Sequence, residues 1–398
     1  MTGGAQDLDL IVVGAGPAGA TAATVAAQRG LRVALVDRAR FPRDKLCGGL
    51  VSGRAHRFLT EVFGPLPEDL FHPVRKVHLR LDEAVLGEVA EAPLMRMTMR
   101  RAFDAALLDR ADAAGAKVHA GVRMAEIDIG GGACGLELSD GTRLAAPLMI
   151  GADGVNSAVA RAVFGRAYDP ARIGFALEIE ASARPDYDWL EIDLGAADWG
   201  YGWVFPKARS LTVGVGGVAV RNPEMKARLL AYLQRHEIDA GALRIKGHHL
   251  PAGDFKRRPG QGPALLAGDA AGLVDPITGE GIAWAVQSGR LAAGVAADML
   301  AEGAPGRALD AYCRALAATH AEMRRARFLR RLIFSGPLRG RFARMLADNP
   351  QMQRRYLAIL NGDLDYADIG PGRILRVLGR MLRAPKATAS SGPARTDG

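Results

Sequence analysis

The most constraining feature of the sequence is a glycine-rich turn between a short apolar run and an alanine-rich stretch. Residues 8–13 read LDLIVV, which is the length of a buried strand, and GAGPAG follows at 14–19. Gly30 is placed to end the alanine-rich helix, and a second apolar run over 31–36 leads to Asp37. Strand, glycine turn, helix and strand in this order predict the first unit of a Rossmann-type α/β domain.

Each glycine of this turn has its own task in that interpretation. Gly14 permits the tight turn, Gly16 lets a pyrophosphate approach the backbone, and Gly19 allows close packing of the helix on the strand. The helix N-terminus then presents its free amides to the phosphates. Asp37 is placed to accept hydrogen bonds from an adenosine ribose. A glycine turn without a ligand is the alternative, and the strand–turn–helix context favours the cofactor.

Charge is distributed unevenly along the chain. The 398 residues include 52 Lys and Arg against 43 Asp and Glu, a net charge of +9. Residues 301–398 hold 18 basic and 8 acidic residues, so the first 300 residues are close to neutral. A basic surface over the whole protein is therefore excluded. No aromatic-basic RNA motif or helix-turn-helix pattern accompanies the excess, so we expect no nucleic-acid partner.

The cysteines and the hydropathy pattern indicate the cellular compartment of the protein. Cys47, Cys134 and Cys313 are widely spaced and odd in number, which excludes a disulfide framework and predicts a reducing cytoplasm. The eight histidines have no metal-ligand spacing, so we expect no metal. The uncharged stretch 10–27 is long enough to span a membrane, but glycines and Pro17 interrupt it and no basic residue precedes it. We expect a cytoplasmic protein, at most peripheral to the inner face of the membrane.

Two further glycine turns lie far downstream. Segments 148–161 and 264–293 each read as strand, glycine turn and helix. Segments 74–92 and 174–220 show the short alternating runs of antiparallel strands, and an amphipathic helix is predicted over 100–114. The fold class is therefore α/β, with a Rossmann-type domain built from separated segments, an antiparallel-sheet substrate domain and a helical C-terminal region.

Domain boundaries are placed where these patterns change. The cofactor-binding domain is assembled from three segments: 7–70, 96–165 and 260–300. The substrate domain is made of two inserted segments: 71–95 and 166–259. The chain is helical in pattern over 301–384, and the composition of 385–398 predicts a disordered tail.

The third turn carries a second set of candidate ligands. A strand pattern ends at Leu266, after which Asp269 offers a carboxylate to hydroxyls of a sugar or ribityl chain. A helix N-cap is the alternative for this aspartate. Gly279 and Gly281 open a helix whose amides would face an electron-rich ring edge, such as the N1/C2=O edge of a reduced flavin.

These segments are similar to known signatures. GAGPAG with Asp37, GADG at 151–154 and AGDAAGLVDPITGEGI at 267–282 resemble the three FAD-binding signatures of the para-hydroxybenzoate hydroxylase-like flavoprotein superfamily. PRDKLCGG at 42–49 and YGWVFPK at 201–207 resemble the geranylgeranyl reductase family within it. The resemblance spans residue 8 to about residue 295 and implies bound FAD. The residues it implies for FAD binding are Gly14, Gly16, Pro17, Ala18, Gly19, Asp37, Arg38, Cys47, Gly48, Arg100, Val122, Asp153, Gly154, Gly268, Asp269, Pro276, Gly279, Gly281 and Ile282.

Four residues are candidates for catalysis. Tyr201, Trp203 and Phe205 alternate, so they project from one face of a strand and form a wall that suits an apolar chain over an isoalloxazine ring. Ordinary core packing is the alternative for these aromatics. Cys47 could donate a proton or shape the pocket, and a small buried hydrophobe is its alternative. Lys45 with its neighbour Arg43 could hold a phosphate head group or be solvated.

The family resemblance implies a function. We expect an FAD-dependent reductase that saturates carbon–carbon double bonds of an isoprenoid, geranylgeranyl-type chain by hydride transfer from reduced flavin. The alternatives are a flavin-dependent monooxygenase or halogenase of an aromatic substrate, and a non-catalytic flavin-binding redox sensor. The halogenase signature W-x-W-x-I-P is matched only loosely at 201–206. No second dinucleotide-binding unit is evident, so the reductant is either NADPH without its own domain or a ferredoxin-like donor.

The basic C-terminal segment supplies one more hypothesis. Residues 323–346 interleave arginines with Phe, Leu, Ile and Met, and Gly336–Pro337 breaks the pattern. Basic amphipathic helices of this kind lie on anionic membranes. Helices packed on the substrate domain with their arginines outward are the alternative.

Overall fold

The glycine turn folds as its sequence predicts in the computed structural model, which describes residues 6–185, 187–241, 243–370, 372 and 379. Strand β2 (Leu10–Val13) is fully buried and leads through the turn into α1 (Pro17–Gln28) and then β3 (Val33–Asp37). A Cβ added at Gly19 would overlap the carbonyl oxygen of Gly14. Glycine at position 19 therefore lets α1 pack directly on the turn.

A parallel sheet collects strands from the separated segments. Its order is β19-β20-β13-β2-β3-β9, and all neighbouring strands are parallel except β19 and β20. The additional strands are β9 (Lys117–Ala120), β13 (Leu148–Gly151), β19 (Gly260–Gln261) and β20 (Ala264–Leu266). This is the discontinuous Rossmann-type sheet that the three glycine turns predict.

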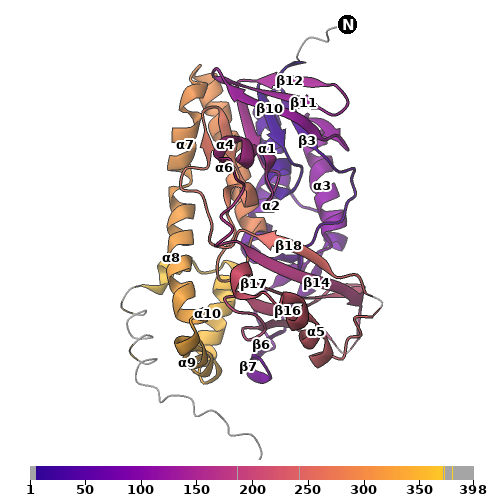
Figure 1. Ribbon diagram of the computed structural model, residues 1–398, viewed down its shortest axis with the longest axis vertical. Coiled ribbons are helices and arrows are strands. Elements are labelled where there is room, and N and C mark those ends of the chain that lie inside the picture. The colour runs from indigo at the N-terminus through magenta and orange to yellow at the C-terminus, as the bar shows by residue number, and fades with distance from the viewer. Residues whose placement is uncertain (1–5, 186, 242, 371, 373–378, 380–398) are drawn as a thin grey trace, which may run out of the picture.

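Helices pack around this sheet, and a small four-stranded sheet contacts it (Figure 1). The helices are α2 (Gly53–Phe63), α3 (Arg100–Ala113), α4 (Ala158–Phe164), α6 (Ile282–Ala301) and α7 (Ala308–Ala315). A four-stranded sheet contains β1 (Gln6–Asp7), β10 (Met124–Gly130), β11 (Ala133–Leu138) and β12 (Arg143–Ala146). A three-stranded sheet contains β4 (Leu50–Val51), β5 (His72–Val74) and β8 (Met95–Met97).

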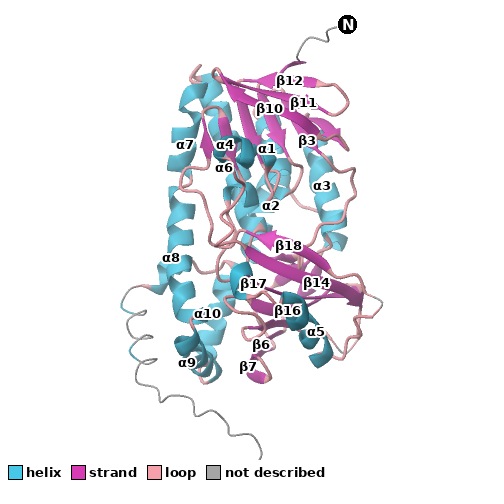
Figure 2. Ribbon diagram, in the orientation of Figure 1, coloured by secondary structure: helices cyan, strands magenta, loops and turns pink. Residues whose placement is uncertain are grey.

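A seven-stranded sheet lies at the other end of the molecule (Figure 2). Its order is β18-β14-β17-β16-β15-β6-β7, antiparallel throughout except for the parallel pair β15 and β6, which come from two different inserted segments. The strands are β6 (Val77–Leu81), β7 (Ala84–Val89), β14 (Gly174–Ser182), β15 (Leu190–Asp193), β16 (Tyr201–Pro206), β17 (Ser210–Val218) and β18 (Lys246–Leu250). One face packs under α5 (Met225–Arg235) through Val204, Val213 and Val215.

The C-terminal region packs against the other face of this sheet. It comprises α8 (Ala317–Phe334), α9 (Gly336–Ala347), α10 (Pro350–Asn361) and the 3₁₀ turn η5 (Tyr366–Ile369). The boundary between α8 and α9 falls at Ser335, as the Gly-Pro pair predicts. Phe334, Phe342 and Leu357 share one core cluster with Trp203. No helix in the described part of the chain is long and apolar enough to cross a membrane. The predicted tail 385–398 lies outside the described residues.

Candidate functional site

A cavity of about 930 Å³ lies where the parallel sheet meets the seven-stranded sheet. Its wall includes the turn after β2, the end of β3, the turn after β13 and the loop before α6. In open α/β sheets, ligands bind outside the carboxyl ends of the strands. The cavity therefore occupies the position in which this architecture holds a nucleotide cofactor.

Most of the predicted site residues line this cavity. The lining includes Gly14, Gly16, Pro17, Ala18, Asp37, Arg38, Cys47, Gly48, Arg100, Val122, Asp153, Gly154, Tyr201, Trp203, Phe205, Asp269, Pro276, Gly279, Gly281 and Ile282. Gly19 and Gly268 do not line the cavity, because Gly19 packs on Gly14 and a Cβ at Gly268 would meet the side chain of Ala18 at 3.0 Å.

The turn after β2 fits a dinucleotide. A Cβ added at Gly16 would meet no atom of the described chain closer than 3.9 Å, so the space above this turn is open. Gly16 is the N-cap of α1 and supplies no side-chain cap to the amides of the first turn. Free amides at a helix N-terminus bind phosphate groups. These amides would hold the pyrophosphate of FAD.

Asp37 lies at the carboxyl end of β3 beside this turn. Its Oδ2 accepts the N–H of Ala15 at 2.7 Å, and its Oδ1 accepts the N–H of Ala39 at 2.8 Å. An ionised carboxylate has about four lone-pair sites. The two backbone bonds fix the orientation of the carboxylate and leave acceptor capacity for ribose hydroxyls.

Asp153 and Gly154 line the cavity and contribute to it in different ways. The Asp153 carboxylate accepts hydrogen bonds from the Ser157 hydroxyl and from the N–H groups of Ala158 and Val159, so it fixes the start of α4. Burial raises its pKa. A Cβ at Gly154 would meet nothing within 4 Å. Gly154 therefore offers backbone to a ligand, whereas the Asp153 oxygens serve local structure.

The loop from Asp275 to Gly281 precedes α6 and faces the cavity. Asp275 accepts the N–H groups of Ile277 and Thr278, each at 2.8 Å, and closes the loop on itself. Gly281 caps α6 without a side chain, so the first amides of this helix are open toward the cavity. Asp269 also lines the cavity and makes no capping bond within the described chain. The arrangement fits the pyrimidine edge and ribityl chain of a flavin.

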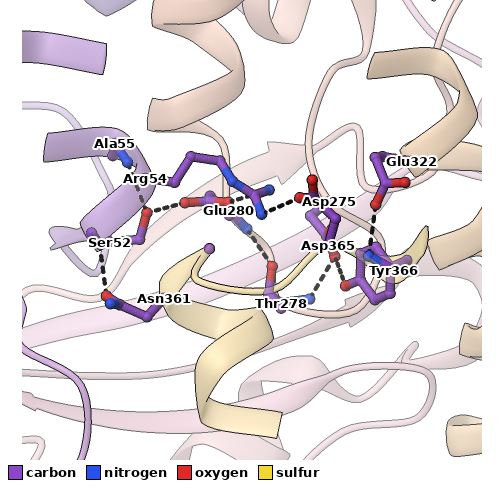
Figure 3. A network of polar contacts seen from close by, with 12 residues as sticks. Ser52, Arg54, Ala55, Asp275, Thr278, Glu280, Glu322, Asn361, Asp365 and Tyr366 are labelled. Atoms are coloured by element: carbon purple, nitrogen blue, oxygen red, sulfur yellow. Dashed lines mark hydrogen bonds and ion pairs between the residues drawn. The ribbon is translucent and has the colours of Figure 1, made fainter. Parts of the chain in front are cut away.

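A buried polar network ties this loop to α2 and to the C-terminal region (Figure 3). Glu280 accepts a hydrogen bond from the Ser52 hydroxyl and lies 3.6 Å from a guanidinium nitrogen of Arg54. Burial raises the pKa of Glu280 to about 7, and the charge of Arg54 opposes this shift. Arg54 also pairs with Asp365 at 2.7 Å. The loop from Asp275 to Gly281 is therefore fixed by contacts with α2, near the N-terminus, and with the C-terminal region.

The network continues along the C-terminal region. The Tyr366 hydroxyl donates to Asp275 at 2.9 Å, and the Tyr366 N–H donates to Glu322 of α8 at 2.7 Å. Asn361, at the end of α10, accepts the N–H of Gly53 at 2.7 Å. Sequence patterns gave no sign of these contacts, because their partners lie up to about 300 residues apart.

Arg100 and Arg43 converge on one buried carboxylate. Arg100 makes a bidentate pair with Asp104 at 2.6 and 2.7 Å, and Arg43 approaches the same carboxylate at 3.2 Å. Arg100 and Cys47 line the same cavity. Arg43 is therefore neither fully solvated nor unpaired, and Arg100 is fixed beside the cavity.

Lys45 forms a pair that sequence analysis missed. Its Nζ lies 2.6 Å from Nε2 of His248 on β18, and both residues line the cavity. Burial and the Lys45 charge lower the pKa of His248 to about 3, and burial lowers the pKa of Lys45. His248 is therefore a neutral acceptor, and Lys45 is the donor.

The three aromatics of β16 form the expected wall and are also part of the core. The ring centroids of Tyr201 and Trp203 are 5.9 Å apart, and those of Trp203 and Phe205 are 6.3 Å apart. Trp203 and Phe205 are each 6% exposed. The Tyr201 hydroxyl donates to the carbonyl of Thr278 at 2.7 Å. The wall therefore touches the cofactor loop directly.

Cys47 lines the same cavity as this wall and Arg100. Its N–H donates to Oε1 of Glu178 at 3.0 Å, and its half-buried thiol is not in a disulfide. A Cβ at Gly48 would lie 2.7 Å from the Phe205 ring, so glycine is needed for this approach. Glu178 lines the same cavity and was not identified from the sequence, where it is one of several acidic residues in an alternating strand.

Comparisons with known proteins agree with this assembly. A family model described as FAD dependent oxidoreductase matches residues 9–163. The chain is 32% identical to the menaquinone reductase of Mycobacterium tuberculosis over 310 residues, which cover 72% of this chain and 75% of that protein. It is 32% identical to the geranylgeranyl diphosphate reductase of Rhodobacter capsulatus over 319 residues, which cover 75% of this chain and 77% of that protein.

A solved structure extends the likeness to nearly the whole chain. A geranylgeranyl bacteriochlorophyll reductase-like protein from Thermoplasma acidophilum has a TM-score of 0.68 at 24% identity and covers 94% of this chain and 96% of that chain. The glycine turns, the discontinuous parallel sheet and the matching family model define an FAD-dependent oxidoreductase. Within that class, the chain belongs to the geranylgeranyl reductase family.

Proposed function

We propose that this protein is an FAD-dependent reductase that saturates carbon–carbon double bonds of an isoprenoid chain. The observation that carries the proposal is the apolar, aromatic wall of Trp203 and Phe205 on the same cavity as the nucleotide-binding turn. Phe334 of α8 and Leu360 of α10 extend this wall. An apolar chain bound there would lie between the C-terminal helices and the loop from Asp275 to Gly281.

The names of the relatives support a polyprenyl chain as the shared element. Menaquinone and geranylgeranyl diphosphate, named for two of them, have different head groups but both carry a polyprenyl chain. An isolated alkene is a poor hydride acceptor, so the protein has to align the chain and exclude water. The buried aromatic wall meets both requirements.

The cofactor and the protein have separate tasks in this reaction. Bound, reduced FAD supplies the hydride. The amides after Gly16 and Gly281 would hold its pyrophosphate and its pyrimidine edge, and Asp37 would hold its ribose. Cys47, Tyr201, Trp203 and Phe205 would position the alkene. We propose NADPH or a ferredoxin-like protein as the source of electrons.

The test is reduction of prenyl compounds by the purified flavoprotein. The flavin is reduced with dithionite without oxygen and mixed with geranylgeranyl diphosphate, a digeranylgeranyl glycerolipid or menaquinone. Dithionite and reduced flavin also convert the menaquinone head group to its quinol, so this product is reoxidised before its mass is measured. We then expect product masses to rise in steps of two hydrogens. No mass gain with any of the three contradicts the proposal. Substrate-stimulated oxygen consumption would instead support a hydroxylase or halogenase, and bound flavin without turnover would support a redox sensor.

A peripheral membrane contact at the cytoplasmic face is a second part of the proposal. Arg324, Phe328 and Arg331 lie on one face of α8, because they are spaced by four and three residues. All three are exposed, and the Phe328 side chain is 52% exposed. By contrast, Arg330 is buried and donates to the carbonyl oxygens of Ala252 and Trp199. Only part of the basic segment therefore faces outward.

A further inference from the structure

Glu178 lies in register with Trp203 of the aromatic wall, two strands away in the seven-stranded sheet. In the register of β14, β17 and β16, Glu178 pairs with Gly214, and Gly214 pairs with Trp203. Residues paired across antiparallel strands point to the same face. A Cβ at Gly214 would overlap the Trp203 indole, so the ring lies over this glycine. The carboxyl of Glu178 and the indole therefore occupy one face with no side chain between them.

The carboxyl of Glu178 is incompletely paired. Glu178 is 5% exposed, its Oε1 accepts the N–H of Cys47, and its Oε2 is enclosed without a hydrogen-bond partner in the described chain. An ionised carboxylate in that position would leave a buried charged oxygen unsatisfied. The neutral acid places its proton on Oε2, because Oε1 already accepts the Cys47 amide. That proton has no acceptor within the described protein.

The neighbouring acidic residue on the same face is different. Glu180 accepts hydrogen bonds from Ser210 and from Thr212, and it pairs with Lys207 at 3.5 Å. Lys207 and Lys246 attract the charge of Glu178, Glu180 repels it, and burial outweighs them. Burial raises the pKa of Glu178 to about 7. The oxygens of Glu180 therefore have hydrogen-bond and ion-pair partners, whereas burial favours the neutral form of Glu178.

Saturation of an alkene needs a proton as well as a hydride. The π bond breaks, and two C–H bonds form, one from the hydride of the reduced flavin and one from an acid on the protein. We propose that Glu178 is this acid, which rests on the reductase function proposed above. Its O–H bond breaks as the proton passes to the alkene carbon that does not receive the hydride. Glu178 is left as a carboxylate and takes a proton from water before the next turnover.

The first arm of the test measures reoxidation of the reduced flavoprotein by geranylgeranyl diphosphate and by the digeranylgeranyl glycerolipid, which have no quinone to accept the electrons in place of the alkene. We expect Glu178→Gln, which keeps an oxygen acceptor for the Cys47 amide, to slow this step by about 100-fold or more, the usual range for loss of a general acid. Reduction of its flavin by dithionite should be unchanged. Glu178→Asp should recover part of the rate, and the matched control Glu180→Gln should stay within about threefold of wild type.

The rate should also depend on pH. Below pH 7 Glu178 is the neutral acid, and above it the carboxylate cannot donate, so the wild-type rate should fall as the pH rises through about 7. The rate of flavin reoxidation in Glu178→Gln should not fall as the pH rises through about 7. A Glu178→Gln variant that folds, binds flavin and reoxidises within about threefold of wild type overturns the proposal.

The second arm needs no turnover. Glu280 is a buried glutamate whose pKa is also raised to about 7, so the test uses the infrared spectrum of the wild type minus that of Glu178→Gln, in which the Glu280 band cancels. This difference should show the carbonyl band of a protonated carboxylic acid at pH 5, which disappears as the pH rises through about 7, and the wild type minus Glu180→Gln difference should show none. Absence of the band from the wild type minus Glu178→Gln difference overturns the assignment of the proton to Glu178. If the wild type reduces none of the three prenyl compounds, the reductase function fails first and this inference fails with it, whereas an active Glu178→Gln removes the inference alone.

Discussion

The Tyr201 hydroxyl donates a hydrogen bond of 2.7 Å to the backbone carbonyl of Thr278, which joins the aromatic wall of the seven-stranded sheet to the loop before α6. Burial raises the pKa of Tyr201, so the phenol stays protonated and remains a donor. A Cβ at Gly279 would overlap the same hydroxyl, so the loop and the ring are in direct contact. Binding at the wall and the position of the loop are therefore linked.

Removal of this hydroxyl should loosen the loop. Tyr201→Phe keeps the ring and leaves the Thr278 carbonyl without its partner, which should cost about 1–3 kcal/mol of unfolding free energy. We expect a lower urea midpoint and faster dissociation of FAD than in wild type. Tyr168→Phe, at a half-buried tyrosine whose ring lies tilted against His249, is the control. Equal FAD dissociation from Tyr201→Phe and wild type would show that this bond does not hold the loop.

Gly214 should tolerate no side chain. Gly214→Ala would push a methyl group into the Trp203 indole, and overpacking of this kind costs about 1–3 kcal/mol. We expect a shift in Trp203 fluorescence, reduced stability in urea and slower turnover of prenyl compounds. Gly306→Ala is the matched control, because a Cβ there would meet nothing within 4 Å. An unchanged indole emission in Gly214→Ala would contradict this account of the sheet face.

The pH dependence of stability should reflect His248. Its pKa falls from 6.5 to about 3 because burial and the Lys45 charge oppose protonation. Between these values the unfolded chain binds a proton that the folded chain does not, so stability is lost as the pH falls below 6.5. We expect the unfolding free energy of wild type to fall by about 1–2 kcal/mol relative to that of His248→Gln from pH 7 to pH 5. The comparison with this variant is needed because the raised pKa values of Glu178 and Glu280 change stability in the opposite direction over the same range.

Nuclear magnetic resonance can check this prediction directly. The ring protons of His248 should keep their chemical shifts from pH 7 to about pH 4. The His248→Gln spectrum identifies the resonances. A titration of His248 near pH 6.5 would show that the imidazole is accessible to water and that its contact with Lys45 is not maintained.

The Arg54–Glu280 pair should carry much of the attachment between the loop and the C-terminal region. Arg54→Met leaves the buried Glu280 without its counter-charge, and such losses cost about 3 kcal/mol. Arg143→Met is the control, because its pair with Glu137 is exposed and should contribute less than about 1 kcal/mol. Urea unfolding of Arg54→Met, Glu280→Gln and the double variant measures the coupling. Additive effects would mean that the two side chains do not act as a pair.

Local patterns predicted the elements of this fold well. The strand-turn-helix unit after Leu10 and the break near Gly336 depend on neighbours in sequence, which a single chain reveals. The parallel sheet followed from three such units. The parallel pairing of β6 with β15 did not, because it joins two inserted segments and no local signal records which strands meet.

Site residues that belong to a sequence motif could be predicted. Site residues that are brought together only by the pairing of strands could not. Asp37 and Cys47 stand in recognisable motifs, whereas Glu178 becomes notable only when β14 and β16 are aligned on either side of Gly214. The glycines of β17 lie in a segment that the sequence predicts only as antiparallel strand. His248 belongs to a pair of adjacent histidines in the sequence, and only the fold places Lys45 beside it.

The exposed face of α8 gives the last prediction. If Arg324, Phe328 and Arg331 meet a membrane, the protein should sediment with vesicles that contain anionic lipid and less with neutral ones. Each arginine near such a surface contributes about 1 kcal/mol, so Arg324→Gln with Arg331→Gln should weaken binding roughly 30-fold. The control pair Arg209→Gln and Lys226→Gln removes the same charge from exposed positions outside α8. Equal binding by both double variants would assign the effect to net charge, and no binding by the wild type would leave α8 as a helix that serves packing alone.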